Sequence, residues 1–383
     1  MKIELTPEQR AARAEFRAFS RAAVAPYADR FDREEAVPAE LIHQLAARGY
    51  LGSLVPAEHR GPGGARREAL DMITYGLLTE ELGWACSSVR SLLTVHDMAA
   101  HGIKRWGSPA LRERWLPRLA CGEVIGALAV SEPEAGSDAS GVRTTAVAEG
   151  DDFVLTGRKK WITFGQIADL FLLVARYEDK PTAFLVERTS PGFGVAPLRG
   201  LLGTRASMLA EITLEGCRIP RENLVGRIGF GVSHVAAAAL ELGRYSVAWG
   251  SVGLAQACLD AARSYAASRE TFGKPIADQQ LVRAMLTDMI VNVRAARLLC
   301  CRAGYLKESG ESSAFAEIMA AKYFASTTAT RAALDAVQIH GANGIGPDYP
   351  VGRFLRDSRV MEIIEGSTQI QQITIPQLDL QEL

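Results

Sequence analysis

The sequence of 383 residues predicts a mainly α protein with a central β-domain. Apolar residues recur with helical spacing up to about residue 122 and again from about residue 232. Between these regions, short apolar runs alternate with Gly, Pro and Asp, a pattern typical of strands. The chain is also too long for one hydrophobic core. We therefore expect an N-terminal helical domain at 1–122, a β-domain at 123–231 and a C-terminal helical domain at 232–383.

The N-terminal region begins with a helix signal. Thr6 can cap a helix that starts at Pro7, because proline is favoured in the first turn. Apolar residues then follow the helical period through Phe16 and Phe19. Further helices are expected around residues 41–46, 70–78 and 110–116, with a glycine-rich loop at 61–64.

The middle region contains five runs with strand character, and the C-terminal region contains four long helical patterns. Strands are expected at 144–148, 152–156, 170–174, 183–186 and 211–215. The last of these alternates polar and apolar residues, as a half-buried strand does. Helices are expected at 232–268, 278–308, 313–340 and 351–371.

The composition excludes several classes of function. The net charge is −1, with 43 basic and 44 acidic residues dispersed along the chain, which argues against a nucleic-acid or membrane-surface binder. The six cysteines form no metal-site spacing, so we expect free thiols and no metal. Neither a signal peptide nor a membrane span is recognisable in the sequence. The expected location is the cytoplasm.

Residues 131–138 (SEPEAGSD) form the first segment with chemical content. They follow an apolar run at 124–130 and combine Gly, Ser, Asp and Pro, which indicates a loop. Such a loop offers backbone N–H groups and small hydroxyls without bulky side chains. It therefore suits a flat or phosphate-bearing ligand.

Residues 364–371 (IEGSTQIQ) form the second segment. Glu365 follows two isoleucines and precedes Gly366. Apolar surroundings raise the pKa of a carboxyl group and suit it to act as a base on carbon acids. The alternative is a glutamate on a helix surface, where most glutamates lie.

Together with four further segments, these two resemble the acyl-CoA dehydrogenase flavoprotein family. The further segments are 157–165 (GRKKWITFG), 269–276 (RETFGKPI), 338–344 (QIHGANG) and 353–359 (RFLRDSR). The resemblance spans the whole chain. It implies an N-terminal helical domain, a middle β-barrel-like domain, a C-terminal four-helix bundle and FAD as the cofactor.

The resemblance also implies the chemistry. Glu365 matches the family's usual base, which removes the proton alpha to a thioester carbonyl while a hydride passes from the beta carbon to the flavin. Some members take the base from an earlier helix, but the matching residue here, Gly243, cannot serve. Arg244 matches an arginine near the catalytic carboxylate, where it can hold and tune Glu365.

Two groups of residues match cofactor positions. Ser131 and Thr163 would hydrogen-bond the isoalloxazine edge and Trp161 would pack on the ring, while Gly136 and Ser137 would approach the pyrophosphate or the thioester arm. Ser367 and Gln369 follow the base at cofactor-contacting positions. The second group matches positions that hold the FAD of a neighbouring subunit, which implies a homodimer or homotetramer. Its members are Arg269, Phe272, Gln280, Gln338, Gly341 and Gly344.

Some residues depart from the family pattern. Ile364 stands where tyrosine is common, Ser367 where threonine is common, and Trp249 where small residues are usual. Residues 245–250 and 361–367 resemble a branch that acts on short acyl groups of an acyl carrier protein. That branch helps to make hydroxymalonyl- or aminomalonyl-type extender units for polyketide pathways.

Several alternatives stay open at this point. An ordinary short-chain acyl-CoA dehydrogenase or oxidase would use the same residues, and the electron acceptor could be an electron-transfer flavoprotein or oxygen. The glutamate base favours these reactions over flavin monooxygenation. A DNA-binding relative is disfavoured by the near-neutral charge. A catalytically silent relative is disfavoured by the retention of Glu365 and both flavin segments.

Overall fold

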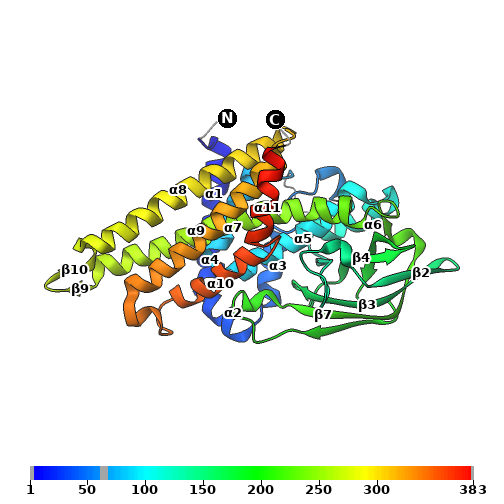
Figure 1. The fold of residues 1–383 in the computed structure, drawn as a ribbon, viewed down its shortest axis with the longest axis horizontal. Helices are drawn as coiled ribbons and strands as arrows, with labels where there is room; N and C mark the ends of the chain where they lie inside the picture. The colour runs from blue at the N-terminus through cyan, green and yellow to red at the C-terminus, as the bar shows by residue number, and fades with distance from the viewer. Residues whose placement is uncertain (1–3, 61–67, 381–383) are drawn as a thin grey trace.

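The computed structural model describes residues 4–60 and 68–380, so the predicted loop at 61–64 lies outside the described residues. Helices occupy both ends of the sequence and a sheet lies between them (Figure 1). The molecule is elongated, with the sheet at one end of the long axis and a small hairpin, β9–β10, at the other. The predicted fold class is confirmed.

The N-terminal helices are α1 (Pro7–Phe19), α2 (Ala28–Glu34), α3 (Ala39–Ala47), α4 (Met72–Ala85), α5 (Ser87–Trp106) and α6 (Pro109–Ala120). Thr6 caps α1 as predicted. Its side chain accepts a hydrogen bond from the backbone N–H of Gln9, and the Gln9 side chain accepts one from the backbone N–H of Thr6. This reciprocal pair satisfies two N–H groups at the start of the helix.

Helix α5 is not among the predicted helices. It is buried along most of its length, and its buried residues include Arg90, Thr94, His96 and Asp97. Polar residues at core positions interrupt the apolar pattern on which helix prediction depends. That the apolar pattern does not predict α5 therefore indicates that this helix has a polar environment in the core of the protein.

The middle region forms one sheet in the order β6-β7-β3-β2-β4-β5-β8, with β1 paired to β4. Its strands are β1 (Gly126–Ala129), β2 (Thr145–Glu149), β3 (Asp152–Ile162), β4 (Leu170–Tyr177), β5 (Lys180–Glu187), β6 (Phe193–Pro197), β7 (Ala210–Pro220) and β8 (Leu224–Val225). The five predicted strands are present. Residues 170–175 of β4 are all buried, which explains why this strand reads as a continuous apolar run without alternation.

The C-terminal region contains α7 (Ala237–Ser268), α8 (Gln280–Glu308), α9 (Ala314–His340), α10 (Val351–Ile363) and α11 (Thr368–Asp379). The hairpin strands β9 (Glu270–Thr271) and β10 (Lys274–Pro275) follow α7. Helices α4 and α7 cross closely, because an added Cβ at Gly83 would lie 2.5 Å from the carbonyl oxygen of Gly250. Short helical turns also occur at Ser20–Val24, Ala25–Tyr27, Ala57–His59, Ala139–Gly141, Arg205–Ser207, Arg221–Asn223, Gly231–Ala236, Ile276–Asp278 and Gly341–Gly344.

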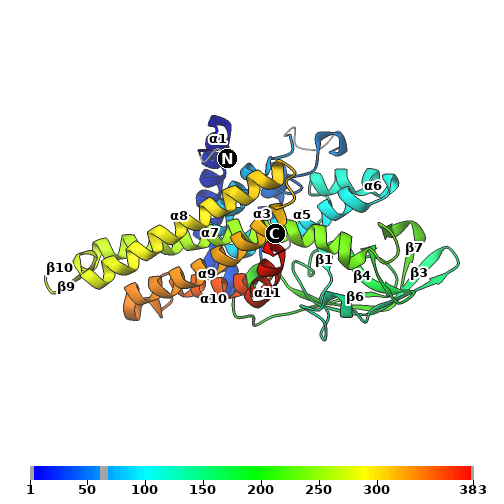
Figure 2. The same cartoon turned by 45° about the horizontal axis from the view of Figure 1, so that its top comes forward.

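The prediction of one helix over 351–371 is wrong. The chain leaves the helix at Ile364 and turns through left-handed conformations at Glu365 (φ 56°) and Gly366 (φ 87°). Ser367 then caps a new helix by accepting a hydrogen bond from Ile370 N–H. The apolar pattern continues across the break, and so it conceals the turn. This turn lies near the middle of the molecule, between the β9–β10 end and the sheet (Figure 2).

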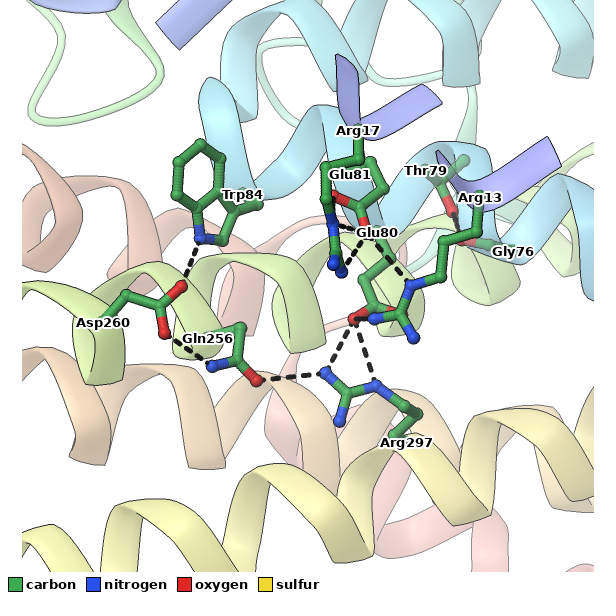
Figure 3. Close-up of polar contacts among 10 residues, drawn as sticks. All are labelled: Arg13, Arg17, Gly76, Thr79, Glu80, Glu81, Trp84, Gln256, Asp260 and Arg297. Atoms are coloured by element: carbon green, nitrogen blue, oxygen red, sulfur yellow. Dashed lines mark hydrogen bonds and ion pairs between the residues drawn. The ribbon is translucent and has the colours of Figure 1, made fainter. Parts of the chain in front are cut away.

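A buried ion-pair network attaches α1 to the C-terminal helices (Figure 3). Glu80 of α4 accepts hydrogen bonds from Arg13 of α1 at 3.1 Å and from Arg297 of α8 at 2.7 Å. Glu81 accepts from Arg13 at 3.0 Å and from Arg17 at 2.9 Å. Both carboxylates are buried, so each depends on its arginine partners for the hydrogen bonds that water would otherwise supply.

Candidate active site

The turn between α10 and α11 presents Glu365 in a strained conformation. A positive φ is unfavourable for glutamate and persists only where its surroundings enforce it. Two side chains from neighbouring helices donate to the turn. Arg244 Nε of α7 donates to the Glu365 carbonyl oxygen at 3.0 Å, and Lys322 Nζ of α9 donates to that of Gly366 at 2.7 Å. Gln371 Nε2 also donates to the carbonyl oxygens of Gly366 at 3.1 Å and Glu365 at 3.3 Å.

The Glu365 carboxylate lies against the backbone of α7. An added Cβ at Gly243 would come within 2.6 Å of Glu365 Oε2 and 2.8 Å of Met98 Sδ. Within the described residues, Oε2 is buried and has no hydrogen-bond partner. Burial raises the pKa of Glu365 to about 7, while the positive charges of Arg244, Arg90 and Lys322 oppose the rise. The site thus contains an unpaired carboxylate whose pKa lies near neutrality.

Lys322 was not identified from the sequence. Its side chain is fully buried, and burial lowers the pKa of the ammonium group to about 8. A lone lysine in a helical pattern normally indicates an exposed position, because lysine is rarely buried. The sequence signal that could have identified Lys322 is its spacing from apolar residues. Lys322 falls on the buried face of α9 with Ile318, Ala325 and Ala329, at intervals of three and four residues.

The loop at 131–138 and strand β3 are joined by two sets of contacts. Lys160 N–H donates to the carbonyl oxygen of Ser131 at 3.0 Å. Lys159 Nζ donates to Glu132 Oε1 at 2.7 Å, and this ion pair is buried. The side chains of Glu132 and Lys159 therefore hold the two predicted flavin segments together. This structural role was not anticipated from the sequence.

Trp161 lies at the edge formed by these segments. Its side chain is 51% exposed, and its backbone has a φ of 64°. A strained conformation that leaves a large aromatic ring open to solvent is a feature typical of ligand sites. Ser131 and Thr163 are half-buried, whereas Gly136 and Ser137 are exposed. An exposed indole beside a loop of small residues fits a flat cofactor with phosphate groups.

The second predicted cofactor group lies near β9–β10, at the end of the molecule opposite the sheet (Figure 1). Tyr265 links the chain after α7 to the end of α9. The backbone oxygen of Tyr265 accepts a hydrogen bond from Arg269 N–H at 2.8 Å, and the Tyr265 ring stacks on His340 with 4.2 Å between ring centroids. Phe272 is 96% exposed. The elements at this end, away from the α10–α11 turn and the sheet, carry the predicted residues Arg269, Phe272, Gln280, Gln338, Gly341 and Gly344.

The remaining predicted positions follow the base. Ser367 is used as the helix cap of α11, and Gln369 is exposed. Across residues 4–60 and 68–380 there is no cluster of His, Cys, Asp and Glu that could hold a metal ion. None of the helices in those ranges is long and apolar enough to cross a membrane.

Comparison with known families covers nearly all of the chain. Residues 6–123, 127–217 and 229–377 match the N-terminal, middle and C-terminal domains of acyl-CoA dehydrogenase, respectively. The chain is 36% identical over 379 residues to an acyl-CoA dehydrogenase of Bacillus subtilis (strain 168), covering 97% of this chain and 98% of the relative. It is also 36% identical to the mitochondrial short-chain specific acyl-CoA dehydrogenase of Mus musculus, covering 97% and 90%.

Two similar solved structures are those of FkbI and AnaB. FkbI, described as acting in biosynthesis of the methoxymalonyl extender unit of the Fk520 polyketide, shares 32% identity at a TM-score of 0.86, covering 96% of this chain and 99% of that one. The prolyl acyl carrier protein oxidase AnaB shares 26% identity at a TM-score of 0.91, covering 98% of this chain and 99% of that one.

Proposed function

Because the chain belongs to the acyl-CoA dehydrogenase family, whose enzymes depend on FAD, we propose that it dehydrogenates a short acyl thioester with Glu365 as the base. One observation carries the assignment of the base. Glu365 offers a buried carboxylate without a hydrogen-bond partner, held on a strained turn, and its pKa is raised to about 7. A base of this strength can accept a proton from a carbon acid near neutral pH.

In the proposed reaction, the alpha proton of the thioester passes to the Glu365 carboxylate and the beta carbon loses a hydride, so that an alpha,beta double bond forms. FAD, when bound, supplies the acceptor for the hydride. Arg244 and Lys322 keep the turn in place through the carbonyl oxygens of Glu365 and Gly366. Their positive charges also favour the ionised form of Glu365, which is the reactive form.

The residues at the flavin edge would hold the cofactor. The open indole of Trp161 suits stacking on the isoalloxazine ring, and Ser131 and Thr163 lie at the same edge for hydrogen bonds. Gly136 and Ser137 leave room for phosphate groups or the thioester arm, since a Cβ at Gly136 would meet no atom within 4 Å. Ser367 and Gln369 would extend the cofactor contacts from the catalytic turn.

A second copy of the chain would complete each cofactor site. Arg269 and Phe272 lie at the β9–β10 hairpin, at the opposite end of the molecule from the sheet to which β3 and its residue Trp161 belong (Figure 1). One chain therefore cannot use both groups on one FAD, whereas two chains in opposite orientation can. We propose a homodimer or homotetramer in which this group holds the FAD of the neighbour.

For the substrate, we propose an acyl group carried by an acyl carrier protein in the formation of a polyketide extender unit. The similarity to FkbI, and to an oxidase of a carrier-protein substrate, supports this branch. Trp249 does not favour either substrate, because its side chain packs between α7 and α4. An added Cβ at Gly76 of α4 would lie 2.8 Å from its Cδ1 atom. The alternative is an ordinary short-chain acyl-CoA dehydrogenase or oxidase, which the similarity to the mouse enzyme favours.

Anaerobic flavin bleaching tests the proposed reaction. The purified yellow protein is mixed with short acyl-CoAs or, in parallel, with the same acyl groups on a carrier protein. Bleaching by carrier-bound substrates alone supports the extender-unit branch, and bleaching by butanoyl-CoA supports the short-chain alternative. A flavoprotein that no thioester bleaches would contradict the proposed activity. Admitting oxygen or an electron-transfer flavoprotein afterwards identifies the acceptor from the rate at which the colour returns.

A further inference from the structure

Helices α5 and α7 face each other along a line of residue pairs that begins at the base. Met98 lies opposite Gly243, beside the Glu365 carboxylate. One turn further along, Thr94 Oγ1 lies 2.6 Å from Ser246 Oγ. At the next turn, an added Cβ at Gly250 would come within 2.8 Å of Arg90 Cδ. The intervals of three and four residues place all these positions on one face of each helix.

Arg90 is a buried cation at the far end of this line. The residue is 1% exposed, and its guanidinium donates to Thr94 Oγ1 and Ser91 Oγ, both at 3.1 Å, and to Met361 Sδ at 3.3 Å. Its Nε has no acceptor, and no carboxylate forms an ion pair with it within residues 4–60 and 68–380. Burial lowers the pKa of Arg90 to about 10, which leaves it charged at neutral pH.

Among the residues that the structure describes, no carboxylate pairs with Arg90 to neutralise this charge. The strongest favourable charge acting on Arg90 is that of Glu365, the proposed base, and Asp357 contributes less. Asp357 already accepts a hydrogen bond from Thr204 N–H at 2.6 Å and interacts with Arg353. A buried cation without an anionic partner is costly to the fold, so its presence beside a proposed substrate site calls for a ligand that supplies the missing acceptor.

We propose that Arg90, together with Thr94 and Ser246, binds oxygen atoms at the distal end of the acyl group. The substrate is then a short acyl thioester that carries a hydroxyl or a carboxylate, and a plain fatty acyl chain is a poor substrate. A guanidinium donates to either group, and most strongly to a carboxylate through paired hydrogen bonds. The inference rests on the proposed function, because the position of the base defines which end of the acyl group reaches Arg90.

The geometry also limits the length of the acyl group. The positions of Met98 and Arg90 are eight residues apart on α5, or about 12 Å along the helix axis. The Arg90 side chain extends back from Gly250 toward Thr94, which shortens the free distance. The hydrogen-bonded hydroxyl groups of Thr94 and Ser246 further reduce the space between α5 and α7. Together these contacts favour an acyl group of few carbons.

The test compares three acyl groups of equal carbon number: butanoyl, 4-hydroxybutanoyl and succinyl. Each is supplied to the FAD-loaded enzyme both as the CoA thioester and on a phosphopantetheinylated acyl carrier protein. Two quantities are measured separately, namely binding from the shift of the flavin spectrum and anaerobic flavin reduction. We expect at least one oxygen-bearing group to bind at least about tenfold more tightly than butanoyl, because the apolar end leaves the Nε of Arg90 without an acceptor and its charge without an anion.

The variant Arg90→Met removes the charge at similar side-chain length. It is expected to reduce the preference for the oxygen-bearing group to about twofold or less, with butanoyl binding unchanged or tighter. Arg105→Met, at an exposed position of the same helix, should retain the wild-type preference. If Arg90→Met does not fold, Thr94→Val is measured in its place and should weaken the preference by at least about threefold.

The outcomes separate this inference from the proposed function. Equal or tighter binding of butanoyl by the wild type, or a preference that survives Arg90→Met, overturns the inference even if every thioester bleaches the flavin. Selective binding of an oxygen-bearing thioester without any bleaching supports the inference and contradicts the proposed reaction. The thioester that binds most tightly, 4-hydroxybutanoyl or succinyl, shows whether the acyl group of the substrate carries a hydroxyl or a carboxylate.

Discussion

The Oε2 atom of Glu365 occupies space that a side chain at Gly243 would need, since an added Cβ at Gly243 would approach it to 2.6 Å. The two residues are 122 positions apart in the sequence, Gly243 in α7 and Glu365 in the turn between α10 and α11. Gly243 is thus the residue of α7 that allows the carboxylate to lie against the helix backbone. The absence of a side chain there is as much a part of the proposed site as the carboxylate itself.

Gly243→Ala is expected to displace the base. An alanine methyl group cannot share this space, so the carboxylate would move by a fraction of an ångström or more. A shift of that size at a reacting group lowers the rate of flavin reduction by about 100-fold. FAD content, read from the visible spectrum, should not change. The control is Gly346→Ala, where the added Cβ would meet only Asn343 O at 3.8 Å; equal activity of the two variants would contradict the assigned role of Gly243.

Glu365→Gln is expected to leave the protein yellow and to abolish turnover. The amide has the shape of the carboxyl group but cannot accept the alpha proton, and a general base contributes about 100- to 10,000-fold to the rate. Stopped-flow flavin reduction measures the loss. Glu362→Gln, near the end of α10, is the matched control, because its side chain accepts a hydrogen bond from Thr330 at 2.6 Å and an amide oxygen can still do so. Loss of FAD from Glu365→Gln, or retained turnover, would refute the proposed base.

The rate of flavin reduction is expected to rise with pH around neutrality. Glu365 must be ionised to accept a proton, and burial raises its pKa to about 7. The rate should therefore be low below pH 6, increase through pH 7 and level off above pH 8, provided the substrate itself does not titrate there. A profile without an inflection near pH 7 would argue that another group limits the reaction.

The same pKa shift predicts a change in stability with pH. The folded pKa of Glu365, about 7, exceeds the ordinary value of 4.5, so between these values the folded state binds more protons than the unfolded state. Ionisation of Glu365 therefore lowers the free energy of unfolding as the pH rises through this window. Glu365→Gln should melt at a higher temperature than the wild type above pH 7, and the difference should disappear toward pH 4.5. Thermal melts at several pH values would reveal a constant difference if this account is wrong.

Lys322→Met is expected to move the pH profile as well as the rate. The variant removes the hydrogen bond to Gly366 O at 2.7 Å and a positive charge that lowers the pKa of Glu365. The inflection in flavin reduction should shift to higher pH, and the maximal rate should fall because the turn loses one of its donors. Lys180→Met, at an exposed position of β5, should alter neither quantity. A reduced rate with an unchanged inflection would leave Lys322 only a structural role.

Sequence reasoning located the turn-forming residues of the site only in part. Glu365 and Arg244 were found because the flanking residues form extended motifs, and the structure places Arg244 Nε against the Glu365 carbonyl oxygen. The break between α10 and α11 was missed, since left-handed backbone at a glutamate depends on donors from α7 and α9 that are remote in sequence. Arg90 and Lys322 were missed for a related reason. A buried cation cannot be distinguished from a surface cation by its residue type, and its spacing from buried apolar residues, as for Lys322 on α9, is the signal that the sequence offers.

The ion-pair network of Glu80 is expected to matter for stability and not for catalysis. Glu80→Gln leaves Arg13 and Arg297 facing a neutral group in a buried setting, and removal of one partner from a buried pair costs about 3 kcal/mol. The melting temperature should fall by several degrees, and α1 should become more sensitive to limited proteolysis, because Arg13 is one of its two contacts with the buried carboxylates. Glu34→Gln is the control. Its partner Arg30 lies 4.0 Å away on the surface, where such a pair contributes less than about 1 kcal/mol. If the two variants melt at the same temperature, the buried network does not anchor α1.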